Sequence, residues 1–115
     1  NTTVKKPNPV NTQSRRVFSE EGGLSGRPLH NRSKEVIELI FNHTEGKIPI
    51  VGVGGIESSD TAWSSIISGA SLLQLYSSLV FQGPSVVSSI VKGIKEKRIE
   101  KGFSNISEAV GYKHK

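Results

Sequence analysis

Two short apolar runs constrain the fold of this chain more than any other feature. Residues 48–53 read Ile-Pro-Ile-Val-Gly-Val, and residues 72–76 read Leu-Leu-Gln-Leu-Tyr. Neither run alternates apolar with polar residues, which is typical of strands that are buried on both faces of a parallel sheet. We therefore expect two buried parallel strands, joined by a helix that crosses over between them.

Helical patterns surround both predicted strands. Four helices are expected, most of them bounded by a capping residue and a glycine: from Ser33 to Gly46, from Ser58 or Ser59 to Gly69, from Pro84 to Gly102, and a short one that Asn105 caps. Residues 5–32 contain three prolines and three glycines, and are expected to form a loop. This alternation indicates an α/β fold. Because two strands cannot form a parallel sheet with both faces covered, we expect the last part of a larger α/β structure.

Composition excludes several classes of site. The 115 residues include no cysteine, so disulfides, thiolate metal sites and a cysteine nucleophile are excluded. His30, His43 and His114 are scattered, show no metal-ligand spacing, and are expected to be solvated surface residues. No metal site is expected. No apolar run approaches the roughly 20 residues that a membrane span requires.

The net charge of +5 comes from the two ends of the chain. Residues 1–16 carry four basic and no acidic side chains, and residues 92–115 carry seven basic and three acidic ones. A small basic nucleic-acid-binding module is therefore an alternative to be weighed. No aromatic-rich basic segment of the kind that stacks on bases is present, so nucleic acid is not the expected partner.

The transition from the first strand to the next helix carries the strongest chemical signal. Gly54 and Gly55 stand where the strand ends, so the backbone can approach a ligand closely and its amides can donate to an anion. Tyr76-Ser77-Ser78 follows the second strand at the corresponding position. In (β/α)₈ barrels, the loops after strands 7 and 8 commonly form a phosphate site together. Neither Lys nor Arg occurs between residues 48 and 91, so backbone amides would supply most of the stabilisation there.

Residues 50–58, followed by Ala62 and Gly69-Ala70, resemble the C-terminal signature of the dihydroorotate dehydrogenase family. Further matches follow in order along the chain: Asn1-Thr2-Thr3, residues 22–29, residues 74–77, Phe81, Gly83-Pro84, residues 109–111 and His114. The pattern is most similar to the class 2, quinone-dependent, membrane-associated branch of that family.

The resemblance implies the C-terminal portion of a (β/α)₈ TIM barrel that holds FMN at the C-terminal ends of its strands. Asn1 would follow strand 6, residues 48–53 would form strand 7, and residues 72–76 would form strand 8. Residues 1–115 would be a fragment of the FMN-binding barrel domain. Its first part, residues 1–32, would be an active-site and loop segment, and residues 33–115 would form alternating helices and strands.

The resemblance also implies roles for individual residues. Asn1 and Thr2 match the pair that contacts orotate. The positions implied to contact FMN are Ser25, Gly26, Gly54, Gly55, Leu75, Tyr76 and Ser77. Ser77 stands where close relatives often have Thr, and a hydroxyl group remains there. The positions implied to lie near the quinone tunnel are Tyr76, Leu79, Val80 and Pro84.

For the complete protein, the resemblance implies oxidation of dihydroorotate to orotate in de novo pyrimidine biosynthesis, with ubiquinone as the electron acceptor. The catalytic base, a serine in class 2 enzymes, belongs to an upstream loop, so no catalytic residue is expected in this chain. Membrane association is expected through a segment absent here, at the mitochondrial inner membrane in a eukaryote or the cytoplasmic membrane in a bacterium. The alternative is another FMN-dependent or phosphate-binding barrel that shares the strand 7–8 site.

Overall fold

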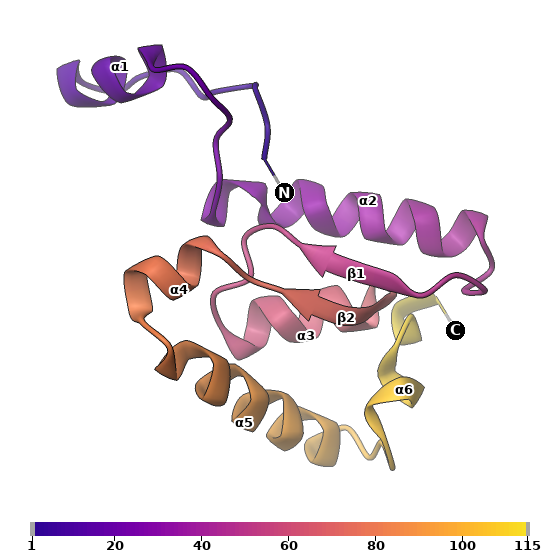
Figure 1. The fold of residues 1–115 in the computed structure, drawn as a ribbon. Helices are drawn as coiled ribbons and strands as arrows, with labels where there is room; N and C mark the ends of the chain where they lie inside the picture. Colours follow the sequence, from indigo (N-terminus) through magenta and orange to yellow (C-terminus); the bar gives the residue numbers. More distant parts are fainter. Residues whose placement is uncertain (1, 115) are drawn as a thin grey trace.

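The computed structural model describes residues 2–114, which form a two-stranded parallel sheet covered by helices (Figure 1). Along the chain, the elements are α1 (Thr12–Ser19), a 3₁₀ turn (Arg27–Leu29), α2 (His30–His43), β1 (Ile50–Val53), α3 (Ser59–Ile67), β2 (Ala70–Gln74), α4 (Ser77–Gln82), α5 (Ser85–Glu100), α6 (Ile106–Ala109) and a final 3₁₀ turn (Tyr112–His114). This order confirms the predicted alternation of helices and parallel strands.

One face of the sheet is covered and the other is not. The register pairs Val51 of β1 with Leu72 of β2, and these side chains are 51% and 65% exposed. Ile50 and Ala70, which also pair, are buried. The prediction that both strands are buried on both faces is therefore wrong for the described residues. The prediction rested on the apolar residues of the two runs. Val51 and Leu72 are such residues, but they form an exposed apolar strip on the sheet.

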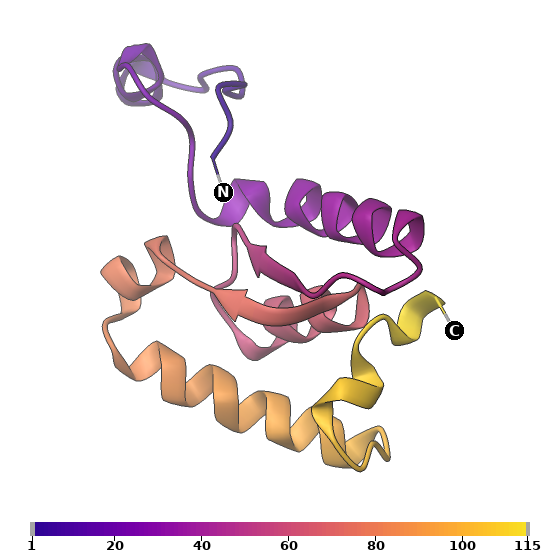
Figure 2. The same cartoon turned by 45° about the vertical axis from the view of Figure 1, so that its right-hand side comes forward.

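The covered face packs against α2 and α3. Ile37 of α2 forms a buried cluster with Ile50 and Ala70. Beside α2, α3 lies between β2 and α5, an arrangement that both views show (Figures 1 and 2). Its Trp63 and Ile66 pack with Ala109 of α6. Burial of this apolar surface, at about 25 cal/mol per Å², is the main term that holds the helices on the sheet.

The predicted helix boundaries around α3 and α6 are confirmed by their caps. The Ser58 hydroxyl accepts from the Thr61 backbone N–H at 3.3 Å, and Thr61 Oγ1 accepts from the Ser58 backbone N–H at 3.0 Å, which completes a capping box. Asn105 Oδ1 accepts from the Glu108 backbone N–H at 3.2 Å and caps α6. The sequence therefore marked both helix starts through short polar side chains.

The prediction of a loop over residues 5–32 is wrong at two places. Asn11 Oδ1 accepts from the Ser14 backbone N–H at 2.7 Å and caps α1, which projects away from the sheet in both views (Figures 1 and 2). Pro28 lies at the start of the first 3₁₀ turn, where its missing N–H costs no hydrogen bond. The helix α2 follows at once from His30. Ser33, predicted as its N-cap, lies inside the helix, and its hydroxyl donates to the Val53 carbonyl at 2.6 Å.

The strand and helix boundaries near residue 76 also differ from the prediction. The second strand begins at Ala70 directly after Gly69 and ends at Gln74, two residues earlier than expected. Leu75 and Tyr76 form the connection, and α4 follows from Ser77 to Gln82, a helix that the sequence pattern did not predict. No helix within residues 2–114 has the length and apolar character that a membrane crossing would need.

Candidate functional site: a cavity at the ends of the strands

A cavity of about 900 Å³ lies where the two strands end. It is lined by Thr2 and by three segments: residues 25–28, residues 53–58 and residues 74–78 together with Phe81 and Gln82. The last two segments follow β1 and β2. The cavity therefore occupies the position where parallel α/β structures bind ligands, beyond the carboxyl ends of their strands.

The structure brings nearly all the predicted FMN and substrate positions to this one cavity. Those that line it are Thr2, Ser25, Gly26, Gly54, Gly55, Leu75, Tyr76 and Ser77. Asn1, the other residue predicted to contact orotate, lies outside the described residues. These eight positions come from four separate segments of the sequence.

The positions predicted near the quinone tunnel divide into two groups. Tyr76 lines the cavity, whereas Leu79, Val80 and Pro84 do not. Leu79 and Val80 are exposed on α4, with 41% and 71% of their surface accessible, and Pro84 is exposed at the start of α5. Among residues 2–114, these three side chains have no cover that would define a tunnel.

Gly55 fits its position for two reasons. Its φ of +69° lies in the left-handed region that favours glycine. A β-carbon at this position would also lie 2.7 Å from the His30 backbone N and 2.8 Å from its Cα. The first obstacle to a side chain at Gly55 is therefore the start of α2, so the glycine allows the β1–α3 loop to pack on that helix.

The segment before α2 reaches the same cavity through backbone contacts. Thr3 and Leu24 exchange two antiparallel hydrogen bonds, with N···O distances of 3.1 and 2.8 Å. Beyond this bridge, Gly26 adopts φ +82° and ψ −150°, a conformation that side chains strongly disfavour. In this conformation Gly26 lies next to Ser77, the first residue of α4.

His30 is not the solvated surface residue that the sequence analysis predicted. Its Nε2 lies 3.0 Å from the Ser64 hydroxyl of α3, and its Nδ1 is buried without a hydrogen-bond partner among the described residues. Burial is the main cause that lowers the pKa of His30, and Lys34 lowers it further, while Glu57 acts in the opposite direction. The neutral imidazole therefore links α2 to α3 beneath the Gly55 loop.

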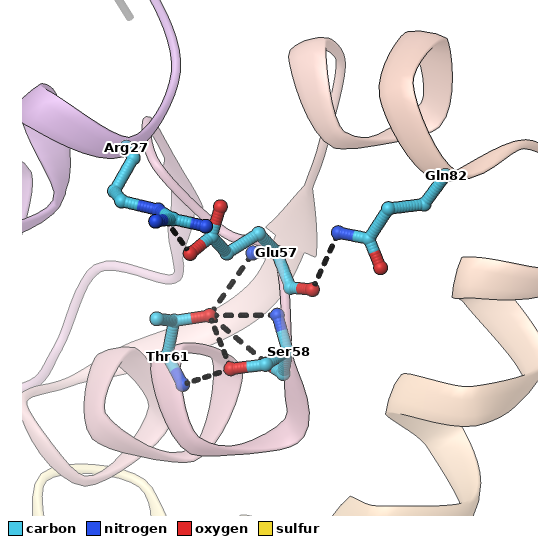
Figure 3. A network of polar contacts seen from close by, with 5 residues as sticks. All are labelled: Arg27, Glu57, Ser58, Thr61 and Gln82. Atoms are coloured by element: carbon cyan, nitrogen blue, oxygen red, sulfur yellow. Dashed lines mark hydrogen bonds and ion pairs between the residues drawn. The ribbon is translucent and has the colours of Figure 1, made fainter.

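Glu57 joins the three segments that surround the cavity, as Figure 3 shows. Its carboxylate oxygen Oε1 lies 2.7 Å from Arg27 Nε, and its backbone carbonyl accepts from Gln82 Nε2 at 3.0 Å (Figure 3). Sequence reasoning did not assign Arg27, Glu57 or Gln82 to the site. Arg27 lay in the predicted loop and Gln82 in the helix that was missed, so no periodic signal connected them.

Apart from one ion pair, the side chains that line the cavity are uncharged, and they include apolar residues such as Val53, Leu75 and Phe81 as well as polar ones. Within the described lining, Arg27 and Glu57 are the charged side chains, and they pair with each other. No group of three or more His, Asp or Glu residues suited to a metal ion occurs within residues 2–114. At the strand ends, backbone amides and the hydroxyls of Ser25 and Ser77 are groups that can donate hydrogen bonds to a ligand, which suits an anionic group such as a phosphate.

Comparison with known proteins identifies the family. Residues 1–97 match the family model described as dihydroorotate dehydrogenase. The chain belongs to the dihydroorotate dehydrogenase family. This confirms the resemblance stated from the motifs.

Among the relatives are proteins named dihydroorotate dehydrogenase (quinone). The protein from Rippkaea orientalis is 47% identical over the whole of this chain and 32% of its own length. The one from Synechocystis is 53% identical over 83% of this chain and 25% of its own length. The chain therefore spans between a quarter and a third of the length of these two relatives.

The solved structures agree with this assignment. A crystal structure of DHODH from Eimeria tenella in complex with ferulenol superposes on this chain with a TM-score of 0.89 at 32% identity. The matched region is the whole of this chain and 30% of the chain in that crystal structure. The described α/β unit is thus similar to part of a dihydroorotate dehydrogenase of known structure.

Proposed function

We propose that this chain forms the C-terminal portion of a TIM-barrel dihydroorotate dehydrogenase, in which its cavity holds the phosphate end of FMN. The observation that supports this most directly is the meeting of Gly26, Gly55, Tyr76 and Ser77 at one cavity. The sequence resemblance implies contact with FMN for these same four positions. The two segments that follow the strands, residues 53–58 and 74–78, contain no Lys or Arg, which fits a phosphate that is bound by backbone N–H groups.

In this proposal, the chain's own residues orient the reactants. Backbone amides near Gly55 and Ser77 would hold the phosphate, and Thr2, with Asn1, would donate to and accept from the flat edge of the pyrimidine. The bound flavin would supply the redox chemistry by accepting hydride from dihydroorotate. The base that removes the proton is proposed to come from upstream in the complete protein.

The proposed electron acceptor is ubiquinone or a related quinone. The relatives reported above carry the word quinone in their names, which supports this choice. Tyr76, Leu79, Val80 and Pro84 are proposed to lie near the quinone path, and the exposed apolar side chains on α4 are compatible with a partner segment packing there. Association with a bacterial cytoplasmic membrane is favoured over the mitochondrial alternative, because those relatives are bacterial.

The decisive experiment uses the complete protein that contains this chain. The purified protein should be yellow, should release FMN on denaturation, and should oxidise dihydroorotate with a soluble ubiquinone analogue as acceptor. Fumarate and NAD serve as control acceptors. A colourless protein that neither binds added flavin nor oxidises dihydroorotate would contradict the proposal. Flavin binding without dihydroorotate oxidation would favour the alternative of a different FMN-dependent barrel.

A further inference from the structure

We propose that the Arg27–Glu57 ion pair sets the electrostatic potential that a phosphate-bearing ligand meets at the rim of the cavity. The inference rests on the proposed function, because the phosphate considered is that of the flavin. Arg27 and Glu57 are the charged side chains within the described lining, and their Nε and Oε1 atoms are 2.7 Å apart. Together they contribute no net charge to a lining whose other side chains are uncharged.

The position of Glu57 does not depend on Arg27 alone. The Glu57 backbone N–H donates to Thr61 Oγ1 at 3.0 Å, and its carbonyl accepts from Gln82 Nε2 at 3.0 Å (Figure 3). Thr61 is itself fixed in the capping box of α3. Both polar groups of the Glu57 backbone are therefore held, and the residue remains beside the cavity when its carboxylate loses its partner.

Exposure of the two partners indicates what the pair contributes. The Arg27 side chain is 81% exposed and the Glu57 side chain 26%. A solvent-exposed pair of this kind adds little to stability, commonly less than about 1 kcal/mol. Its stronger effect is on the local potential, because an unpaired Glu57 would repel a phosphate that carries close to two negative charges, and an unpaired Arg27 would attract it.

The two single neutralisations therefore have opposite effects. Arg27→Gln leaves the Glu57 carboxylate unpaired and should weaken FMN binding, whereas Glu57→Gln leaves the Arg27 guanidinium unpaired and should strengthen it. A purely mechanical link between the segments predicts the same direction for both variants. The signs of the two changes thus separate an electrostatic role from a structural one.

The test is a titration of the complete protein, freed of its cofactor, with FMN and with riboflavin, followed by the change in flavin fluorescence. Riboflavin carries the same ring system without the phosphate. We expect Arg27→Gln to raise the Kd for FMN by about threefold to tenfold at low salt and Glu57→Gln to lower it, with the double variant close to wild type. The Kd for riboflavin should change little. The effect should diminish between about 0.01 M and about 1 M salt, as the Debye length falls from roughly 30 Å to 3 Å.

Two further variants control for loss of binding that is caused by misfolding. Arg27→Lys keeps the charge and should bind FMN like the wild type, and Gln82→Ala removes a contact to Glu57 without changing charge, so it should affect both ligands equally. Equal weakening of FMN and riboflavin binding by Arg27→Gln and Glu57→Gln would overturn the proposal. It would also be overturned if Arg27→Lys bound FMN as weakly as Arg27→Gln does. If the wild-type protein binds neither ligand, the proposed function itself is wrong.

Discussion

Gly26 lies against Ser77, so that a β-carbon on Gly26 would be 3.5 Å from the Cβ of Ser77. The contact joins the segment before α2 to the first residue of α4 at the wall of the cavity. A side chain at position 26 would make ordinary contact with Ser77, and it is the positive φ of +82° that favours glycine here.

Gly26→Ala should therefore both strain the protein and weaken flavin binding. Forcing a side chain into this conformation costs about 1–3 kcal/mol. Gly83→Ala is the matched control, because Gly83 has φ +74° but a β-carbon there would meet nothing within 4 Å and the residue does not line the cavity. Urea unfolding of the complete protein should show a loss for both variants, whereas the Kd for FMN should rise for Gly26→Ala alone. An unchanged Kd for Gly26→Ala would show that this contact does not shape the site.

Gly55→Val should remove flavin binding, and the cause begins within the protein. The new side chain would collide with the backbone of His30, so the β1–α3 loop would have to move before any ligand arrives. Ser77→Ala should have a much smaller effect, because the backbone amide at that position remains. Absorbance of the bound flavin after purification measures both. Full flavin occupancy in the Gly55→Val protein would refute the proposed location of the phosphate.

The free energy of unfolding of the complete protein should fall as the pH decreases through the range in which His30 titrates. Burial lowers the pKa of His30 below its ordinary value of about 6.5, so the unfolded chain binds the proton more readily than the native state does. The contribution of the neutral imidazole is complete above about pH 6.5 and is lost as the pH falls through the lowered native pKa. Lys34 adds to this lowering and Glu57 opposes it. His30→Gln should flatten the dependence of Tm on pH between about pH 7.5 and 5; a slope equal to that of the wild type would contradict the assignment.

Isolated residues 1–115 should not unfold as a cooperative two-state domain. Val51 and Leu72 leave an apolar strip exposed on one face of the sheet, and a parallel sheet of two strands has unpaired edges on both sides. Calorimetry of the isolated polypeptide should show no sharp heat-absorption peak. A single transition whose calorimetric and van't Hoff enthalpies agree would disprove this expectation.

The sequence predicted those parts of the fold that depend on local chemistry. Ser58 and Asn105 predicted the starts of α3 and α6, because short polar side chains cap helix starts. Gly69 predicted the end of α3, because glycine tolerates the φ of +124° that the chain adopts there. The glycines at positions 54 and 55 likewise marked the cavity. The resemblance to a known family added the residues from distant segments, which local patterns could not have connected.

The features that escaped prediction depend on contacts between distant segments. Serine is a common N-cap residue, yet the Ser33 hydroxyl donates to the Val53 carbonyl and α2 begins earlier, at His30. The Arg27–Glu57 pair joins the 3₁₀ turn before α2 to the connection between β1 and α3. Nothing in the local sequence around either residue indicates that they meet.

Ile56 belongs both to the cavity lining and to the buried cluster with Ala62, Val86 and Ile90. Leu75 also lines the cavity and packs against this cluster while remaining only partly buried. For laboratory evolution aimed at new ligands, exposed lining residues such as Ser25 and Phe81 are therefore the positions that can vary at little cost to folding, whereas Gly55 and Ser58 are not. At Ile56 the two requirements coincide, and a library that randomises this residue will contain a larger share of unfolded members than one that leaves it fixed.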